Sequence, residues 1–91
     1  MAERRRRVTA GELREILEKQ GYRCALTGIE LAPDTVSFDH LKPIAIGGSQ
    51  AARNIQAVHR VVNRMKHTLD NADFVSWCRL VSDYSREPAE D

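Results

Sequence analysis

The segment Phe38-Asp39-His40-Leu41-Lys42-Pro43-Ile44-Ala45-Ile46-Gly47-Gly48 (FDHLKPIAIGG) decides the fold of this chain. A short apolar run ends there in an adjacent acid and imidazole, and a proline and a pair of glycines follow. Residues 36–38 favour a short strand, the glycine pair favours a loop, and residues 54–56 (Asn-Ile-Gln) favour a second strand that returns beside the first. We therefore expect a two-stranded antiparallel hairpin whose first strand ends near Asp39 and His40.

A helix is expected on the N-terminal side of this hairpin. Residues 9–12 (Thr-Ala-Gly-Glu) match a capping box, in which the first and fourth side chains bond each other's backbone N–H groups. Apolar residues then recur at helical spacing, and Gly21 supplies a stop signal. These signals predict a helix over roughly residues 10–20.

Two more helices are expected on the C-terminal side of the hairpin. Val58, Val61, Val62 and Met65 recur at i, i+3, i+4 and i+7, which predicts a helix with these four side chains buried. That helix should leave its polar residues outside the buried stripe. Asp70 or Asn71 can then cap a last helix. Its buried side should carry Phe74, Trp77, Cys78 and Val81, for which packing in the core is a better interpretation than stacking on nucleic-acid bases.

The fold class that follows is a small α+β domain, a hairpin plus helix flanked by an N-terminal and a C-terminal helix. We expect residues 1–8 to form a basic flexible arm, residues 9–84 the domain, and residues 85–91 an acidic disordered tail. A chain of 91 residues makes a single domain with a modest core. Its two cysteines and lack of a leader favour a reducing cytoplasm. Its apolar runs are too short to span a bilayer, so we expect a soluble chain with no membrane partner.

The charge of the chain is small overall but strongly polarised. Residues 1–67 carry 12 basic and 7 acidic side chains, whereas residues 68–91 carry 2 and 6. No acidic residue lies between Asp39 and Asp70, and all three histidines fall in that interval. Such a segment suits a polyanion. The basic side chains expected to contact nucleic-acid phosphates are Lys42, Arg53, Arg60, Arg64 and Lys66.

Two asparagines lie downstream of the Asp-His pair at defined distances from it. Asn54 follows His40 by 14 residues, and Asn63 follows Asn54 by 9. Together with the Asp-His pair, the Gly pair, the Asn-Ile-Gln run and the Asn-x-x-Lys run that starts at Asn63, this pattern resembles the HNH endonucleases. The resemblance covers about residues 22–82. It implies the ββα-metal fold, in which a hairpin and a helix hold one divalent metal ion.

The resemblance also implies a role for each polar residue. His40 would activate water, since an imidazole can accept a proton near neutral pH. Asn54 would fix the His40 ring by offering its side-chain oxygen to the imidazole N–H. Asp39 and Asn63 would hold Mg²⁺ or Mn²⁺ through oxygen atoms. The expected reaction is hydrolysis of DNA that leaves a 5′-phosphate and a 3′-hydroxyl.

Many HNH proteins also hold a structural zinc ion with two Cys-x-x-Cys pairs. The matching stretches here are Cys24-Ala-Leu-Thr27 and His59-Arg-Val-Val62, which keep only two potential ligands. Because a closed site needs four, we expect no structural zinc, with Cys24 and Val62 in the core. His67, four residues after Asn63, is open to three interpretations: a third metal ligand, a phosphate contact or an exposed residue.

Two alternatives to the nuclease remain. One is a catalytically silent nucleic-acid-binding module of the same fold. The other is a protein-interaction domain that uses the acidic tail and the helix with Phe74 and Trp77. Taken singly, the Asp-His pair is also typical of a turn, Asn54 of a turn and Asn63 of a solvated helix position. The sequence leaves open whether a second copy or a larger nuclease system assists, because one site per chain cuts one strand.

Overall fold

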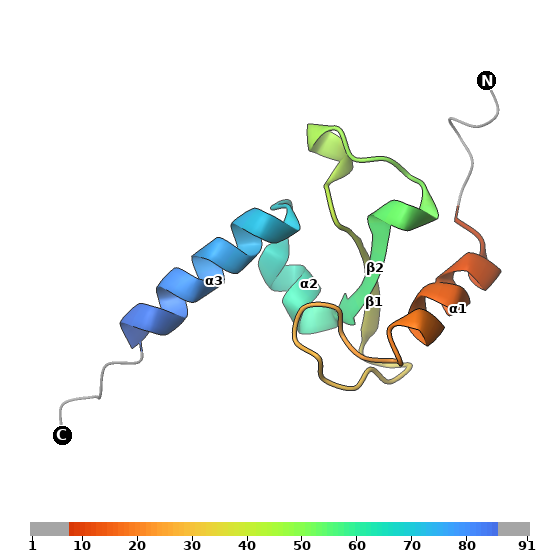
Figure 1. Ribbon diagram of the computed structural model, residues 1–91, viewed down its shortest axis with the longest axis horizontal. Helices are drawn as coiled ribbons and strands as arrows, with labels where there is room; N and C mark the ends of the chain where they lie inside the picture. The colour runs from red at the N-terminus through yellow and green to blue at the C-terminus, as the bar shows by residue number, and fades with distance from the viewer. Residues whose placement is uncertain (1–7, 86–91) are drawn as a thin grey trace.

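The computed structural model describes residues 8–85 and confirms the α+β fold class, with a two-stranded antiparallel sheet and three α-helices (Figure 1). Apart from Val8 and Ser85, the predicted arm and tail lie outside the described residues, and Ser85 is the last residue of a helix rather than part of a tail. The elements in chain order are α1 (Ala10–Lys19), β1 (Val36–His40), the short 3₁₀ turns η2 (Ile44–Ile46) and η3 (Ala52–Asn54), β2 (Ile55–His59), α2 (Arg60–Lys66) and α3 (Asn71–Ser85).

The hairpin is formed by β1 and β2, which pair over their whole length from Val36 opposite His59 to His40 opposite Ile55. Asp39 consequently lies directly across from Gln56. Each strand is longer than its pattern predicted: Asp39 and His40 extend the first strand, and residues 57–59 extend the second, because all of them pair across the sheet. The two strands are joined by residues 41–54, which arch above the sheet in Figure 1.

Helix α1 begins with the predicted capping box. The Thr9 hydroxyl accepts from the Glu12 N–H at 3.1 Å, and the Glu12 carboxylate accepts from the Thr9 N–H at 2.9 Å. Just after the helix, the Gln20 side chain bonds both backbone groups of Ala57, at 2.9 and 3.0 Å. These bonds satisfy peptide groups on the open edge of β2 and hold α1 beside the sheet.

Helix α2 packs against β1, but the face that it buries differs from the prediction. Val58 belongs to β2, and the helix starts only at Arg60. Val61 and Met65 are exposed, whereas Lys66, expected outside the buried stripe, is completely buried. The predicted stripe is wrong because polar side chains of α2 that bond β1 set the inward face of this short helix.

The apolar core of the described chain is small. Its buried apolar residues are Cys24, Ala57, Val58 and Phe74. Helix α3 points away from the hairpin (Figure 1), so Phe74 is 7% exposed while Trp77 is 60% exposed. The expectation that Cys24 and Phe74 are buried is confirmed, and the expectation that Trp77 and Val81 are buried is wrong, because no other element covers that length of α3 within residues 8–85. None of the helices in this part of the chain is long and apolar enough to cross a membrane.

Candidate functional site

The polar residues singled out by the sequence gather around the end of β1. Successive residues of a strand point to opposite faces, so Ser37 and Asp39 share one face and Phe38 and His40 the other. The face with Ser37 and Asp39 is the one that α2 contacts, through the bonds described below. Asp39 and His40 therefore open on the two sides of the same strand end.

Asp39 is held by a buried ion pair. Its Oδ2 lies 2.8 Å from the Lys66 ammonium nitrogen, and the two side chains are 10% and 0% exposed. Lys66 also donates to the His40 backbone oxygen at 2.8 Å. The Gln56 amide nitrogen donates to the same Oδ2 at 3.1 Å. Two donors on one carboxylate oxygen fix the orientation of Asp39, and they leave Oδ1 as the oxygen that the described contacts do not use.

Lys66 was predicted to contact phosphate, and this prediction is wrong. Its ammonium group is enclosed between α2 and β1, where it compensates the Asp39 carboxylate. A charge that is buried needs such a partner, because removing it from water is costly. Lys66 is therefore a structural residue of the site. It has no exposed surface that could contact a ligand.

Asn63, one turn before Lys66, faces the same side of β1. Its Nδ2 donates to the Ser37 hydroxyl oxygen at 2.6 Å. This bond uses the nitrogen of the amide, so the oxygen is the atom suited to bind a cation. Asn63 and Asp39 thus belong to adjoining places on one interface, each fixed by a bond between α2 and β1.

His40 contributes its ring on the other side of the strand end. Its Nε2 lies 3.4 Å from the Gln50 side-chain oxygen, a long hydrogen bond to the loop that follows β1. The ring is half-buried, so solvent can reach it. A base that accepts a proton from water needs both accessibility and a fixed direction.

Asn54 lies near His40, but its bonds differ from the prediction. Its Oδ1 accepts from the Lys42 backbone N–H at 3.1 Å rather than from the imidazole, and its Nδ2 donates to the backbone oxygens of Lys42 and Ser49, at 3.0 and 2.7 Å. The predicted direct contact with His40 is therefore wrong. Asn54 instead joins two parts of the loop, the backbone at Lys42 and the backbone at Ser49. Gln50, which contacts the His40 ring, follows Ser49 in this loop.

The glycine pair serves the same loop. A Cβ atom on Gly48 would lie 1.8 Å from the Lys42 backbone oxygen, a distance that no side chain could tolerate. Gly47 has φ of 100°, a left-handed conformation that favours glycine. The Gly pair, like Asn54, thus allows the segment after His40 to fold back tightly on itself.

The donor set at the strand end suits a hard divalent cation. Asp39 offers a carboxylate oxygen and Asn63 an amide oxygen, and such ions as Mg²⁺ or Mn²⁺ bind through few protein oxygens and keep several waters. In residues 8–85 there is no group of three or more His, Cys, Asp or Glu side chains placed to hold a metal ion. A metal ion held by these two protein oxygens would take most of its coordination from water and substrate.

A basic pocket adjoins Asn63 on α2. Its lining combines two guanidinium groups, an imidazole and neutral polar groups, without a carboxylate, which is the composition of an anion site. His67 contributes its ring from an uncommon backbone conformation with φ of 53° and ψ of −117°, of a kind that clusters at functional sites. The lining residues are Ser37, Arg60, Asn63, Arg64, His67 and Thr68.

The remaining basic residues lie apart from this pocket. Lys42 and Arg53 are exposed on the loop between the strands, at its two ends. The sequence-predicted phosphate contacts thus divide into a pair on α2, Arg60 and Arg64, and a pair on the loop. In the chain, the loop pair precedes β2 and the α2 pair follows it.

In the two stretches that match the zinc-binding segments, the potential ligands Cys24 and His59 bond backbone groups. The Cys24 sulfur is buried and accepts from the His59 backbone N–H at 3.4 Å. Burial raises the pKa of this thiol, but hydrogen bonds from the Thr27 side chain and from nearby backbone groups together hold it below its usual value. His59 caps α2 instead, because its Nδ1 accepts from the Val61 N–H at 3.1 Å.

Three polar residues at the site were not assigned by the sequence. Ser37 orients Asn63, Gln50 contacts His40, and Asn71 bonds Gln56 through two side-chain hydrogen bonds. Gln56 was noticed only as part of the Asn-Ile-Gln run. The one signal that could have found Ser37 is its two-residue offset from Asp39, which puts both on one face of a strand.

A scan against protein-family models finds no match to this chain, and a search of curated proteins finds none. The functional assignment therefore depends on the geometry of the strand end, α2 and the loop.

Proposed function

We propose that this chain is an HNH-type, metal-dependent endonuclease that hydrolyses phosphodiester bonds in DNA. The observation that carries the proposal is the way in which α2 is attached to β1. Two side-chain contacts, Lys66 to Asp39 and Asn63 to Ser37, attach both predicted metal ligands to the interface of β1 and α2, and Asp39 precedes His40 directly in the chain. These contacts support a single site formed by two residues that are 24 positions apart in the sequence.

Asp39 and Asn63 hold a divalent metal ion in this proposal, Mg²⁺ or Mn²⁺. When bound, such an ion stabilises negative charge on the phosphate and on the departing oxygen. Lys66 and Gln56 both contact the Oδ2 atom of Asp39, so the Oδ1 atom is the one assigned to the metal ion. Preorganised ligands of this kind need little rearrangement when the substrate arrives.

His40 is the general base. Its imidazole takes a proton from a water molecule as the water oxygen bonds to phosphorus. The bond between phosphorus and the 3′ oxygen breaks, and the departing oxygen takes a proton from solvent water. The products carry a 5′-phosphate and a 3′-hydroxyl. Asn54 is a positioning residue that acts through the loop, because its three bonds fix the segment from which Gln50 reaches the ring.

DNA is held by its phosphates. The pocket with Arg60, Arg64 and His67 adjoins Asn63, so a phosphate bound there lies next to the proposed metal ligand. Contacts to phosphate fix the register of the duplex and carry no sequence information by themselves. We place the enzyme in a reducing cytoplasm, since Cys24 and Cys78 are both free thiols.

Cleavage of supercoiled plasmid tests the proposal. Purified protein should nick or linearise the plasmid with Mg²⁺ or Mn²⁺, and EDTA should stop the reaction. The His40→Ala variant should lose about 100-fold or more in rate, the usual contribution of a general base. A matched control is His59→Asn, since asparagine also caps helices and His59 serves α2 rather than the strand end. Cleavage by His40→Ala at the wild-type rate would contradict the assigned role.

The second candidate is a silent nucleic-acid-binding module. The buried ion pair favours it, because the Lys66 ammonium already compensates the Asp39 charge that a metal ion would neutralise. This module would shift DNA in a gel with or without metal ions and would cut no plasmid. Binding that persists in the presence of EDTA, with no cleavage in any metal, would select this candidate.

A further inference from the structure

The amide pair formed by Gln56 and Asn71 lies behind the candidate metal ligand. Gln56 is 5% exposed and lies opposite Asp39, one pair from the end of the hairpin. Its Nε2 donates to Asp39 Oδ2 at 3.1 Å and to Asn71 Oδ1 at 2.9 Å, and its Oε1 accepts from Asn71 Nδ2 at 3.0 Å. Both N–H groups of this buried amide are therefore used.

An apolar side chain could fill the same space, so the choice of an amide needs a reason. A buried amide brings a desolvation cost whenever one of its groups lacks a partner. Here that cost is avoided only because Asn71 matches Gln56 in both directions. The amide pair has a geometric consequence for the site. Asn71 accepts from one N–H of the Gln56 amide, and the other N–H points at Asp39.

Asn71 also connects this contact to α3. It is the first residue of that helix, and its backbone N–H donates to the Leu41 oxygen at 3.2 Å. Leu41 directly follows His40 in the chain. The start of α3 is thus bonded to Gln56, which contacts Asp39, and to the backbone directly after His40.

We propose that Gln56 and Asn71 are positioning residues, which together hold the Asp39 carboxylate in the rotamer that binds the metal ion. The inference rests on the proposed function and extends it. Lys66 supplies the charge that Asp39 needs, while the amide pair supplies direction, because an N–H of a fixed planar amide restricts the carboxylate more than a rotating ammonium does. Partners of this kind typically change metal affinity by about 10–100-fold.

The test uses the full chain and the double variant Gln56→Met with Asn71→Leu. Removing both partners leaves no unpaired amide, so thermal stability should stay near that of the wild type. Two measurements follow: the Asp39 χ1 rotamer from NMR three-bond couplings, and Mn²⁺ binding by calorimetry without DNA. We expect a single Asp39 rotamer in the wild type, averaging in the double variant, and Mn²⁺ binding weakened about tenfold.

Gln20→Met is the matched control. Gln20 is also an amide with two bonds to the hairpin, but these reach the backbone of Ala57 on the far edge of β2. This variant should lose stability while Asp39 keeps its rotamer and Mn²⁺ binding is unchanged. If the double variant fails to fold, Gln56→Glu retains an acceptor for Asn71 Nδ2 and removes the donor to Asp39, and its Asp39 rotamer should change.

The two measurements separate this inference from the proposed function. A single unchanged Asp39 rotamer in the folded variants, or unchanged Mn²⁺ binding in the double variant, would overturn the positioning role. Absence of Mn²⁺ binding by the wild type would overturn the proposed metal site and with it this role in metal binding. The rotamer measurement would then still report whether the amide pair orients Asp39.

Discussion

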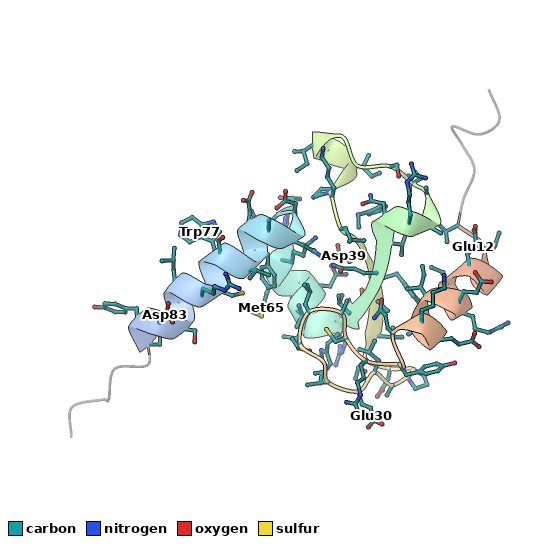
Figure 2. The ribbon with its side chains drawn as sticks, viewed as in Figure 1. Glu12, Glu30, Asp39, Met65, Trp77 and Asp83 are labelled. Carbon is teal, nitrogen blue, oxygen red and sulfur yellow. The ribbon has the colours of Figure 1, made fainter. Side chains whose placement is uncertain are left out.

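Two regions of the described chain are stabilised in opposite ways. Around β1 and α2, polar side chains are buried and bonded to one another, and Lys66 has no exposed surface. Along α3, apolar side chains such as Trp77 and Tyr84 stand in solvent, as Figure 2 shows for Trp77. In the same view Asp39 points into the middle of the molecule, toward α2, while Trp77 points outward from the distant helix.

This difference in burial separates a region that fixes the geometry of side chains from a region that adds little to stability. Burying polar groups stabilises less than burying apolar groups of the same size, so a buried polar network is explained best by the specific geometry that it produces. The network here orients Asp39. Exposed aromatic and aliphatic groups on α3 do little for the stability of the isolated chain, since they remain in contact with water.

The largest effect is expected from breaking the ion pair. Lys66→Met should leave the Asp39 carboxylate buried without its cation and lower the free energy of unfolding by about 3–5 kcal/mol. Urea denaturation followed by circular dichroism measures this value. The control is Arg64→Met on the exposed side of the same helix, with an expected change within about 0.5 kcal/mol. Equal stability of the two variants would contradict the buried pair.

A smaller effect should separate two aromatic residues one turn apart on α3. Phe74→Ala should cost about 3 kcal/mol, because Phe74 is buried where α3 meets the rest of the chain. Trp77→Ala should cost less than about 1 kcal/mol, since most of its surface is already exposed. The same denaturation experiment compares them. A larger loss for Trp77 than for Phe74 would show that α3 packs differently in solution.

The smallest effect concerns DNA binding by the pocket on α2. Arg64→Ala should reduce by about 1 the slope of log K against log salt, the change expected for one lost phosphate contact. Arg79→Ala, on the exposed length of α3, should leave that slope unchanged. Fluorescence anisotropy with a labelled duplex over a range of salt concentrations gives both slopes. An unchanged slope for Arg64→Ala would remove this residue from the interface.

The parts of the fold that depend on local signals were predictable from the sequence. The capping box at Thr9 and Glu12 forms as expected, because both partners lie in one helical turn. The hairpin also follows from local signals, with strands bounded by a loop that Gly47 and Gly48 permit. The same proximity in sequence made Asp39 and His40 recognisable as one strand end.

The details that the sequence did not predict depend on partners distant in the chain. Lys66 looked like a surface residue because nothing near it in the sequence shows that Asp39 lies beside it. Asn54 was given the imidazole as its partner, whereas the loop backbone at Lys42 lies closer to its oxygen. Trp77 has the helical spacing of a core residue, but spacing does not tell whether another element covers that face.

The central claim is that Asp39 and Asn63 form one metal site beside His40. Titration of Mn²⁺ into ¹⁵N-labelled protein tests it most directly, because the paramagnetic ion broadens the NMR signals of nuclei close to it. The account predicts selective broadening of the backbone amides of Asp39, His40 and Asn63, which Asp39→Asn weakens, while amides near Trp77 stay sharp. Broadening confined to acidic residues of α3, such as Asp83, or no selective broadening at all, would contradict the proposed site.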